Sequence, residues 1–307
     1  MAGKGTKILA SDYNSMQSNV ALVLGQGSGD YGYGQSVSSS QVSTNSRITV
    51  SQWTNLRSDL LRCIQHQTNS DYTGSIPTPT TALTITSERY DSFKTVSDLI
   101  GPGRLTLPTG QSTLETIAST VRTTAWNGLI SQTVTLTFPE SGIYPGTYGG
   151  RYFFNSGGRI QFTASRTGGN TGLKNTSWTT LLQNMGTIYF DYTTTSVVGG
   201  TGTFVSNIGF YDLTTSDQVI FEKTLANGEL YYPNIYYIKA RVNDVTNRNQ
   251  VIFTIVFNDA ATSTGHNPTW AIDENVDGTL TSTVQSYRAT GSNVTVVAPS
   301  VVASGIA

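Results

Sequence analysis

The sequence carries little charge for its length. Charged residues make up 12% of the 307 residues, against about 25% in an average soluble protein. The net charge is −1, and no run of lysines or arginines occurs. Because proteins bind nucleic acid phosphates through clustered cations, we expect no nucleic acid partner.

Cysteine and histidine are almost absent. Cys63 is the only cysteine, so no disulfide can form within the chain. The two histidines, His66 and His266, are too few for a histidine-rich metal site, and no G-x-S-x-G nucleophile elbow occurs. His66 lies near the end of a predicted helix, where we expect it to cap the helix or to face solvent. With no complete catalytic constellation in the sequence, we expect neither enzymatic activity nor a cofactor.

Long hydrophobic runs are missing as well. The apolar stretch at residues 20–24 is far too short to span a bilayer. The first twelve residues contain two lysines but lack the apolar segment of a secretory signal. We therefore expect no membrane insertion and a cytoplasmic origin.

The spacing of apolar residues divides the sequence into parts. In residues 1–128, apolar side chains recur at helical spacing, which predicts helices joined by polar loops. Ser11 is the expected N-cap of the first helix, and Thr49 with Gln52 forms a capping box at the start of the second. The four helices are expected near residues 11–24, 49–66, 87–100 and 114–126.

After residue 129 the period changes to two, which is typical of half-buried strands. Seven short apolar runs, beginning with the one around Leu136, are separated by glycine- and asparagine-rich turns. This pattern predicts an antiparallel β-sandwich over residues 129–260, interrupted by a short helix near residues 178–185. Residues 261–307 are expected to form an extended arm. The predicted fold class is α+β: a helical N-terminal module, an antiparallel β-sandwich and an extended C-terminal arm.

One segment partly matches a calcium-binding loop. Asp273, Asn275 and Asp277 supply oxygens at the first, third and fifth positions, and Gly278 stands at the turn. The twelfth position, which should carry a bidentate glutamate, is Val284, and a strand rather than a helix is expected there. Calcium binding and a plain acidic hairpin turn both remain open, with the turn favoured.

Aromatic residues are the main candidates for contacts with other proteins. The chain has 16 tyrosines, which can stack on sugars, fill interfaces or pack in a sandwich core. Trp53 and Tyr90 are the large aromatic candidates on the helices. The long Gly/Ser-rich loop at residues 25–47 adds Tyr31 and Tyr33, and loops of this length are usually functional or disordered. We expect this loop to become ordered on contact with a neighbouring subunit.

Several short motifs carry a resemblance to a known family. They are Asp12-Tyr13-Asn14, Gly25-Gln26-Gly27-Ser28-Gly29, Tyr31-Gly32-Tyr33-Gly34-Gln35, Gln52-Trp53, Gln65-His66-Gln67-Thr68, Arg151-Tyr152-Phe153-Phe154, Asn175-Thr176-Ser177-Trp178 and Gly209-Phe210-Tyr211-Asp212-Leu213. With these motifs, from about residue 5 to 300, the chain resembles virion structural proteins of tailed bacteriophages, especially phages of marine cyanobacteria. The segment at residues 151–169 looks like a β region of those proteins.

The resemblance implies a component of the tail, baseplate, neck or fibre region. Such a protein is assembled in the host cytoplasm and released by lysis, so its expected location is the virion. Expected partners are further copies of the chain and other virion proteins, with the helical module as the anchor. Two alternatives stay open: an adhesin that binds host-surface glycans, and a tail-fibre depolymerase. A depolymerase would need a positioned carboxylate pair such as Asp217 with Glu222, and nothing in the sequence singles this pair out.

Overall fold

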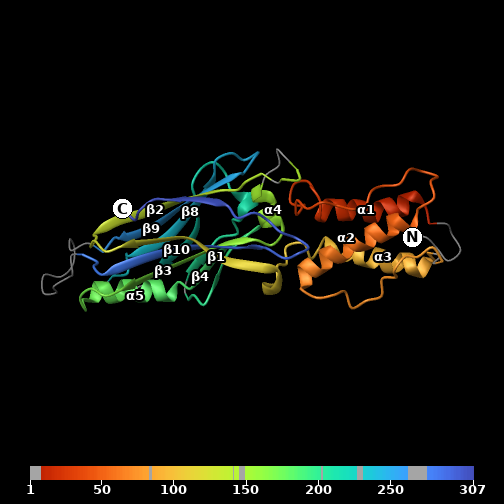
Figure 1. Cartoon of the computed structure of the whole chain (residues 1–307). Coiled ribbons are helices and arrows are strands. Elements are labelled where there is room, and N and C mark those ends of the chain that lie inside the picture. The colour runs from red at the N-terminus through yellow and green to blue at the C-terminus, as the bar shows by residue number, and fades with distance from the viewer. Residues whose placement is uncertain are drawn as a thin grey trace. The chain divides into compact units, whose positions relative to one another are not determined.

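The computed structural model describes residues 8–82, 85–140, 142–144, 149–201, 203–226, 231–261 and 275–307. The fold class is α+β, as predicted, with helices and two antiparallel sheets arranged as a sandwich (Figure 1). The chain divides into two compact units. The helical unit comprises Met1–Thr113, Glu140–Gly158 and Arg288–Val297, and the sandwich unit comprises Leu114–Pro139, Arg159–Tyr287 and Ala298–Ala307.

Three helices build the helical unit: α1 (Ala10–Val23), α2 (Val50–Thr68) and α3 (Ser87–Ile100). The capping box predicted at the start of α2 is confirmed, since the Gln52 backbone N–H donates to Thr49 Oγ1 and the Gln52 side chain accepts from the Thr49 backbone. The cap of α1 differs from the prediction. Leu9 takes the N-cap position, and its N–H donates to the Asp12 carboxylate at 2.8 Å. Ser11 therefore lies in the first turn.

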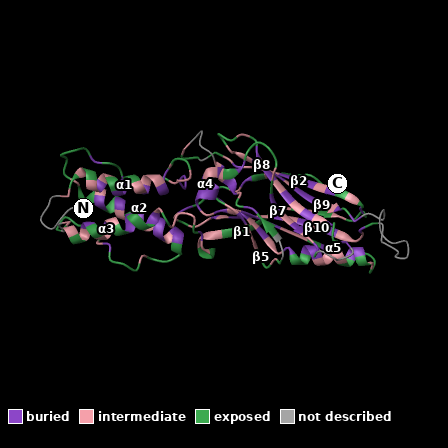
Figure 2. Ribbon diagram, turned by 180° about the vertical axis from the view of Figure 1, so that it is seen from behind, coloured by how far each residue is buried: buried purple, intermediate pink, exposed green. Residues whose placement is uncertain are grey.

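Apolar side chains of the three helices meet in one core. Figure 2 shows buried residues on the inward-facing sides of α1, α2 and α3. The Trp53 ring contacts Tyr13 edge-on at 5.3 Å between ring centroids and Phe93 at 4.7 Å. One residue from each helix thus forms an aromatic contact at the centre of this core. The helical unit also contains the short elements η1 (Thr109–Gln111) and α4 (Gly149–Asn155).

The loop at residues 25–47 is held by the helices of its own chain. The Asn14 side chain on α1 exchanges two hydrogen bonds with the Val42 backbone, at 2.9 and 2.8 Å. The Asp59 carboxylate on α2 accepts the backbone N–H groups of Ser38 and Ser39, at 3.0 and 2.7 Å. These contacts correct the expectation that the loop needs a neighbouring subunit to become ordered. Polar side chains on α1 and α2 fix it, and the sequence pattern did not show these contacts.

The sandwich unit contains two antiparallel sheets. The first has the order β1 (Ser112–Arg122), β10 (Thr279–Ala289), β3 (Arg159–Thr167), β4 (Thr187–Phe190) and β5 (Thr195–Val198). The second has the order β11 (Ser300–Ala303), β2 (Gly128–Thr137), β9 (Gln250–Asp259), β8 (Ile235–Val242), β7 (Gln218–Thr224) and β6 (Thr203–Val205).

Alternating residues of the two sheets meet in a buried layer. Phe253 on β9 contacts Phe162 on β3 at 4.9 Å and Phe190 on β4 at 5.3 Å between ring centroids. The predicted interrupting helix is α5 (Leu173–Asn184), which lies beside β3 (Figure 1). A short helix, η2 (Phe210–Asp212), follows β6.

Two expected elements are different in the structure. The fourth helix, expected near residues 114–126, is instead the strand β1, which pairs with β10. Its β-branched threonine, isoleucine and valine residues favour extended backbone, and pairing with β10 outweighs the weak helical spacing. The segment at 151–154, compared above with a β region, lies in the helix α4.

The expected C-terminal arm is part of the sandwich. β10 lies between β1 and β3 and buries Leu280, Val284 and Ala289, and β11 pairs with β2. The Ala307 backbone also exchanges two hydrogen bonds with Ser131 on β2, at 2.8 and 3.1 Å. The last strands were not recognised as sandwich strands because they are separated from β9 by a polar segment. The domain boundaries expected after residues 128 and 260 therefore do not coincide with the limits of the two units.

Candidate functional site

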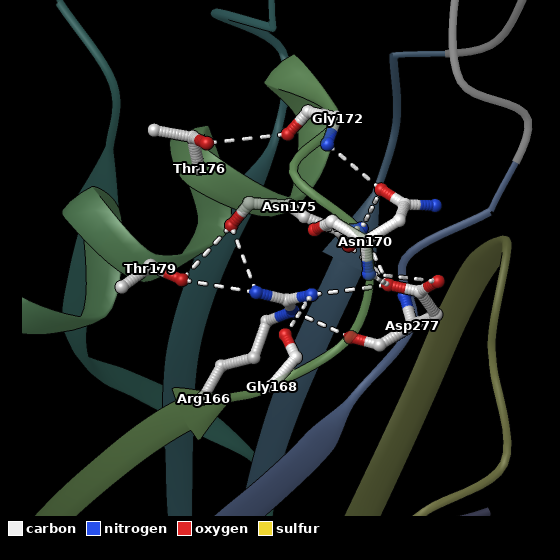
Figure 3. A network of polar contacts seen from close by, with 8 residues as sticks. All are labelled: Arg166, Gly168, Asn170, Gly172, Asn175, Thr176, Thr179 and Asp277. Atoms are coloured by element: carbon white, nitrogen blue, oxygen red, sulfur yellow. Dashed lines mark hydrogen bonds and ion pairs between the residues drawn. The ribbon is translucent and has the colours of Figure 1, made fainter.

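The most extensive polar network among the described residues surrounds the first turn of α5 (Figure 3). Arg166 enters it from the end of β3, Asn170 from the following turn, Asn175 from α5 and Asp277 from the turn before β10. The Arg166 side chain is only 4% exposed and forms an ion pair with Asp277 at 3.1 Å. Sheet pairing between β3 and β10 brings these residues together, although they are more than 100 positions apart in sequence.

The Arg166 guanidinium uses its whole donor set within the protein. Nε donates to the Asp277 carbonyl at 2.6 Å, and one terminal nitrogen donates to the Asn175 carbonyl at 3.3 Å and Thr179 Oγ1 at 3.1 Å. The other donates to the Gly168 carbonyl and to Asp277 Oδ1, both at 3.1 Å. Because a guanidinium has five N–H donors, none is left to bind an anion. Arg166 therefore joins the two turns and does not offer a binding group.

The weak calcium candidate lies at the same place. Asp273 falls outside the described residues, and Asn275 is exposed. The Asp277 carboxylate accepts from Arg166, from the Asn170 backbone at 3.2 Å and from the Asn175 side-chain amide. Asp277 is thus already paired with a cation, and Val284 at the twelfth position is buried in β10. In the described part of the chain, no group of three or more His, Cys, Asp or Glu residues could hold a metal ion.

An open pocket of about 350 Å³ lies beside this network. It is lined by Arg166, by the turn at residues 168–171 and by α5 residues with amide or hydroxyl side chains, among them Thr176, Thr180 and Gln183. Amide and hydroxyl groups of this kind suit an uncharged ligand rich in hydroxyls, such as a sugar.

The aromatic residues predicted to form interfaces are mostly in the core. Trp53 and Tyr90 are each 4% exposed and Tyr33 is fully buried, so they pack inside the helical unit and are not surface contacts. Tyr33 OH donates to the Arg104 carbonyl at 2.7 Å. Only Tyr31 is partly exposed, and its ring lies 4.3 Å from the Arg104 guanidinium. Regular apolar spacing predicted the helices that carry Trp53 and Tyr90. This spacing does not show whether an aromatic side chain packs in the core or lies in an interface.

His66 also differs from its expected role, since it is fully buried and neither caps a helix nor faces solvent. Its Nε2 lies 3.1 Å from the Ser156 carbonyl, and its Nδ1 is buried without a hydrogen-bond partner. Burial lowers the pKa of His66 to about 4, so the ring is neutral at neutral pH. Cys63, one turn earlier, is buried as well, and burial raises the pKa of its thiol. Cys63 is therefore a small, packed side chain of the core.

The carboxylates considered for a depolymerase are not brought together. Asp217 lies just before β7 and pairs with Arg241 at 3.3 Å, whereas Glu222 lies five residues further along the strand. At about 3.3 Å per residue, this places the two roughly 16 Å apart. Glycosidase carboxylates are about 5–10 Å apart. This pair therefore does not have the geometry of a glycosidase site.

Sequence reasoning missed Arg166, Asn175 and the exposed edge strand β1 as features of interest. The polar network combines β3, α5 and β10, and no local motif marks such a combination. β1 was missed because its spacing also fits a helix. The comparisons add no relative: no protein family model, curated protein or solved structure matches the chain.

Proposed function

We propose that this chain is a structural component of a tailed-phage virion, which acts by binding further copies of itself and other virion proteins. The observation that carries the proposal is the edge strand β1. It has 11 residues, none of them buried, and Figure 2 shows it in the colours of partial and full exposure. In the described part of the chain, β1 pairs only with β10, so its other edge has no neighbouring strand.

Such an edge favours pairing with another chain. Its backbone N–H and C=O groups can form a ladder with an added strand. Proteins that avoid this pairing use short edges, proline or several lysines. β1 is long, contains no proline, and has Glu115 and Arg122 as its only charged residues. Leu114 is 50% and Val121 is 56% exposed, so a second copy would also bury apolar surface there.

The low charge of the chain supports the same role. Packing one copy against another requires few ions to lose their water, which is the costly step in burying charged surfaces. The resemblance to phage virion proteins supplies the biological setting, the virion as location and the other virion proteins as partners. The helical unit stays the proposed anchor, although its large aromatics are buried and its contact surface must consist of other residues. Among the described residues, no helix has the length and apolar character needed to cross a membrane.

The test uses a double substitution on β1, Leu114→Lys with Val121→Lys. Both side chains are exposed, and because an even and an odd position lie on opposite faces of a strand, the two lysines place one charge on each face of β1. The monomer should therefore keep its fold while association weakens. The matched control is Val198→Lys at the end of β5, which is also 56% exposed and also on an edge strand. Sedimentation and incorporation into phage particles are the measurements.

We expect the wild-type protein and the control to self-associate and to enter particles, and the double variant to do so less. If the double variant associates like the wild type, β1 is not the interface. A wild-type protein that stays monomeric and is absent from particles would contradict the assembly role itself.

A second candidate function, binding of host-surface glycans, is favoured by the pocket beside α5. Its test is binding of purified protein to host lipopolysaccharide or capsule, with Gln183→Ala as the pocket variant and Gln41→Ala as a control in another loop. Loss of binding in the pocket variant alone would support an adhesin. Release of reducing ends in the same mixture would instead indicate a depolymerase.

A further inference from the structure

A buried charged pair lies in the sandwich unit. Lys174 on α5 is 1% exposed, and Asp259 at the end of β9 is fully buried. Lys174 Nζ contacts Asp259 Oδ2 at 2.7 Å. Placing both charges in the core costs desolvation free energy, and the functions proposed above make no use of the pair.

A third polar residue, Asn234, lies opposite Asp259 in the sheet. In the β8–β9 ladder, Ile235 lies opposite Asn258, so the next position places Asn234 opposite Asp259. Opposed residues of antiparallel strands point to the same face, with Cβ atoms about 4.5–5.5 Å apart. Asn234 is fully buried and its side-chain nitrogen has no hydrogen-bond partner, and the nearby amide acts to lower the pKa of Asp259. Lys174 and Asn234 thus both lie against one carboxylate.

The surroundings of this cluster are aromatic and dry. Trp178, one turn after Lys174 on α5, is fully buried, and its Nε1 lies 3.4 Å from Asp259 Oδ1. The Tyr231 ring centroid lies 5.9 Å from Lys174 Nζ. Burial raises the pKa of Asp259, against the opposing effect of Lys174. The raised pKa makes the Asp259 carboxylate a better proton acceptor, so it can take a proton from its hydrogen-bonded partner Lys174.

We propose that Lys174 and Asn234 become joined by an intramolecular isopeptide bond, with Asp259 as the proton relay. Asp259 takes a proton from the Lys174 ammonium, and the resulting amine attacks Cγ of Asn234. The C–N bond to Lys174 forms, the bond from Cγ to the side-chain nitrogen of Asn234 breaks, and Asp259 returns the proton to that leaving nitrogen. The second proton of the attacking amine also passes to it through Asp259, so this nitrogen leaves as ammonium and Asp259 is again a carboxylate. No oxidant, metal or cofactor takes part.

The structure supplies the other requirements of this reaction. Asn234 Oδ1 accepts the Ala261 backbone N–H at 2.9 Å, which polarises the carbonyl and stabilises the negative charge that develops on this oxygen. The fixed placement of amine and amide replaces an encounter in solution by an intramolecular step. Exclusion of water protects the bond once it has formed. The product would link α5 covalently to the start of β8.

The experiment is the intact mass of the full-length protein measured after denaturation, followed by a tryptic map. We expect the wild type to be lighter than its sequence by one ammonia molecule. Trypsin should then fail to cut after Lys174, and fragment 167–223 should appear joined to fragment 224–239. Lys174→Arg keeps a cation beside Asp259 but lacks the amine nucleophile, so this variant should have its full mass. Asp259→Ala keeps both reacting residues and should also have its full mass.

Any other result contradicts the bond itself, the pair of residues that it joins or the role of Asp259. A wild-type protein of full mass has no bond. Loss of one water molecule, with fragment 167–223 joined to fragment 249–288, would place the bond between Lys174 and Asp259 instead. Retention of the bond in Asp259→Ala would remove Asp259 as the relay. Cyclic imide formation at Asn227-Gly228 also releases ammonia. It leaves the two tryptic fragments separate, and it also occurs in Lys174→Arg. A mass deficit with these two features therefore counts against the isopeptide bond.

Discussion

Acid should destabilise the helical unit through the buried ring of His66. The unfolded chain binds a proton at the ordinary histidine pKa of 6.5, whereas burial lowers the pKa of His66 to about 4 in the folded protein. Between these two values the unfolded state binds more protons than the folded state, so stability rises with pH and is lost as pH falls from 6.5 to about 4. At about 1.36 kcal/mol per pKa unit, the loss from this residue is about 3 kcal/mol.

The matched variant is His66→Gln, which keeps an N–H donor for the Ser156 carbonyl but does not titrate. The assay is urea unfolding followed by far-UV circular dichroism at several pH values from 7 to 4, which gives the free energy of unfolding. Carboxylates lower stability in acid in both proteins, so the informative quantity is the difference between their pH slopes. We expect the wild type to lose about 3 kcal/mol more than the variant. Parallel slopes would show that the His66 ring is hydrated or protonated in the folded state.

Two further substitutions test polar contacts that fix the chain. Asp59→Asn removes the charge that accepts the Ser38 and Ser39 N–H groups, so we expect faster hydrogen exchange at both amides and a loss of about 1.5–3 kcal/mol; unchanged exchange would mean that other contacts hold the loop. Arg166→Leu leaves Asp277 without its cation, and thermal or urea unfolding should show a loss of about 3–5 kcal/mol. Asp277→Asn keeps a hydrogen-bond acceptor for Arg166 and should lose less stability. Equal losses in the two variants would show that the ion pair is not the main contribution to stability.

The sequence by itself determined the elements that depend on local periodicity and capping. Helix α3 begins and ends where its apolar spacing predicts, and α2 begins at the capping box of Thr49 and Gln52. The strands β8 and β9 follow from strict alternation. These features are local because hydrogen bonds within one turn, or the face on which a side chain lies, decide them.

Only the tertiary structure decided which of two possible local conformations was adopted, and where charged groups lie. β1 has spacing compatible with a helix, and it becomes a strand because β10 offers a ladder. His66 lies at a helix end, yet packing against Tyr33, at 4.8 Å between ring centroids, buries it. Lys174, Asn234 and Asp259 are far apart in sequence, and the register of β8 and β9 with the placement of α5 brings them together. Contacts of this kind depend on long-range pairing, which no sequence window contains.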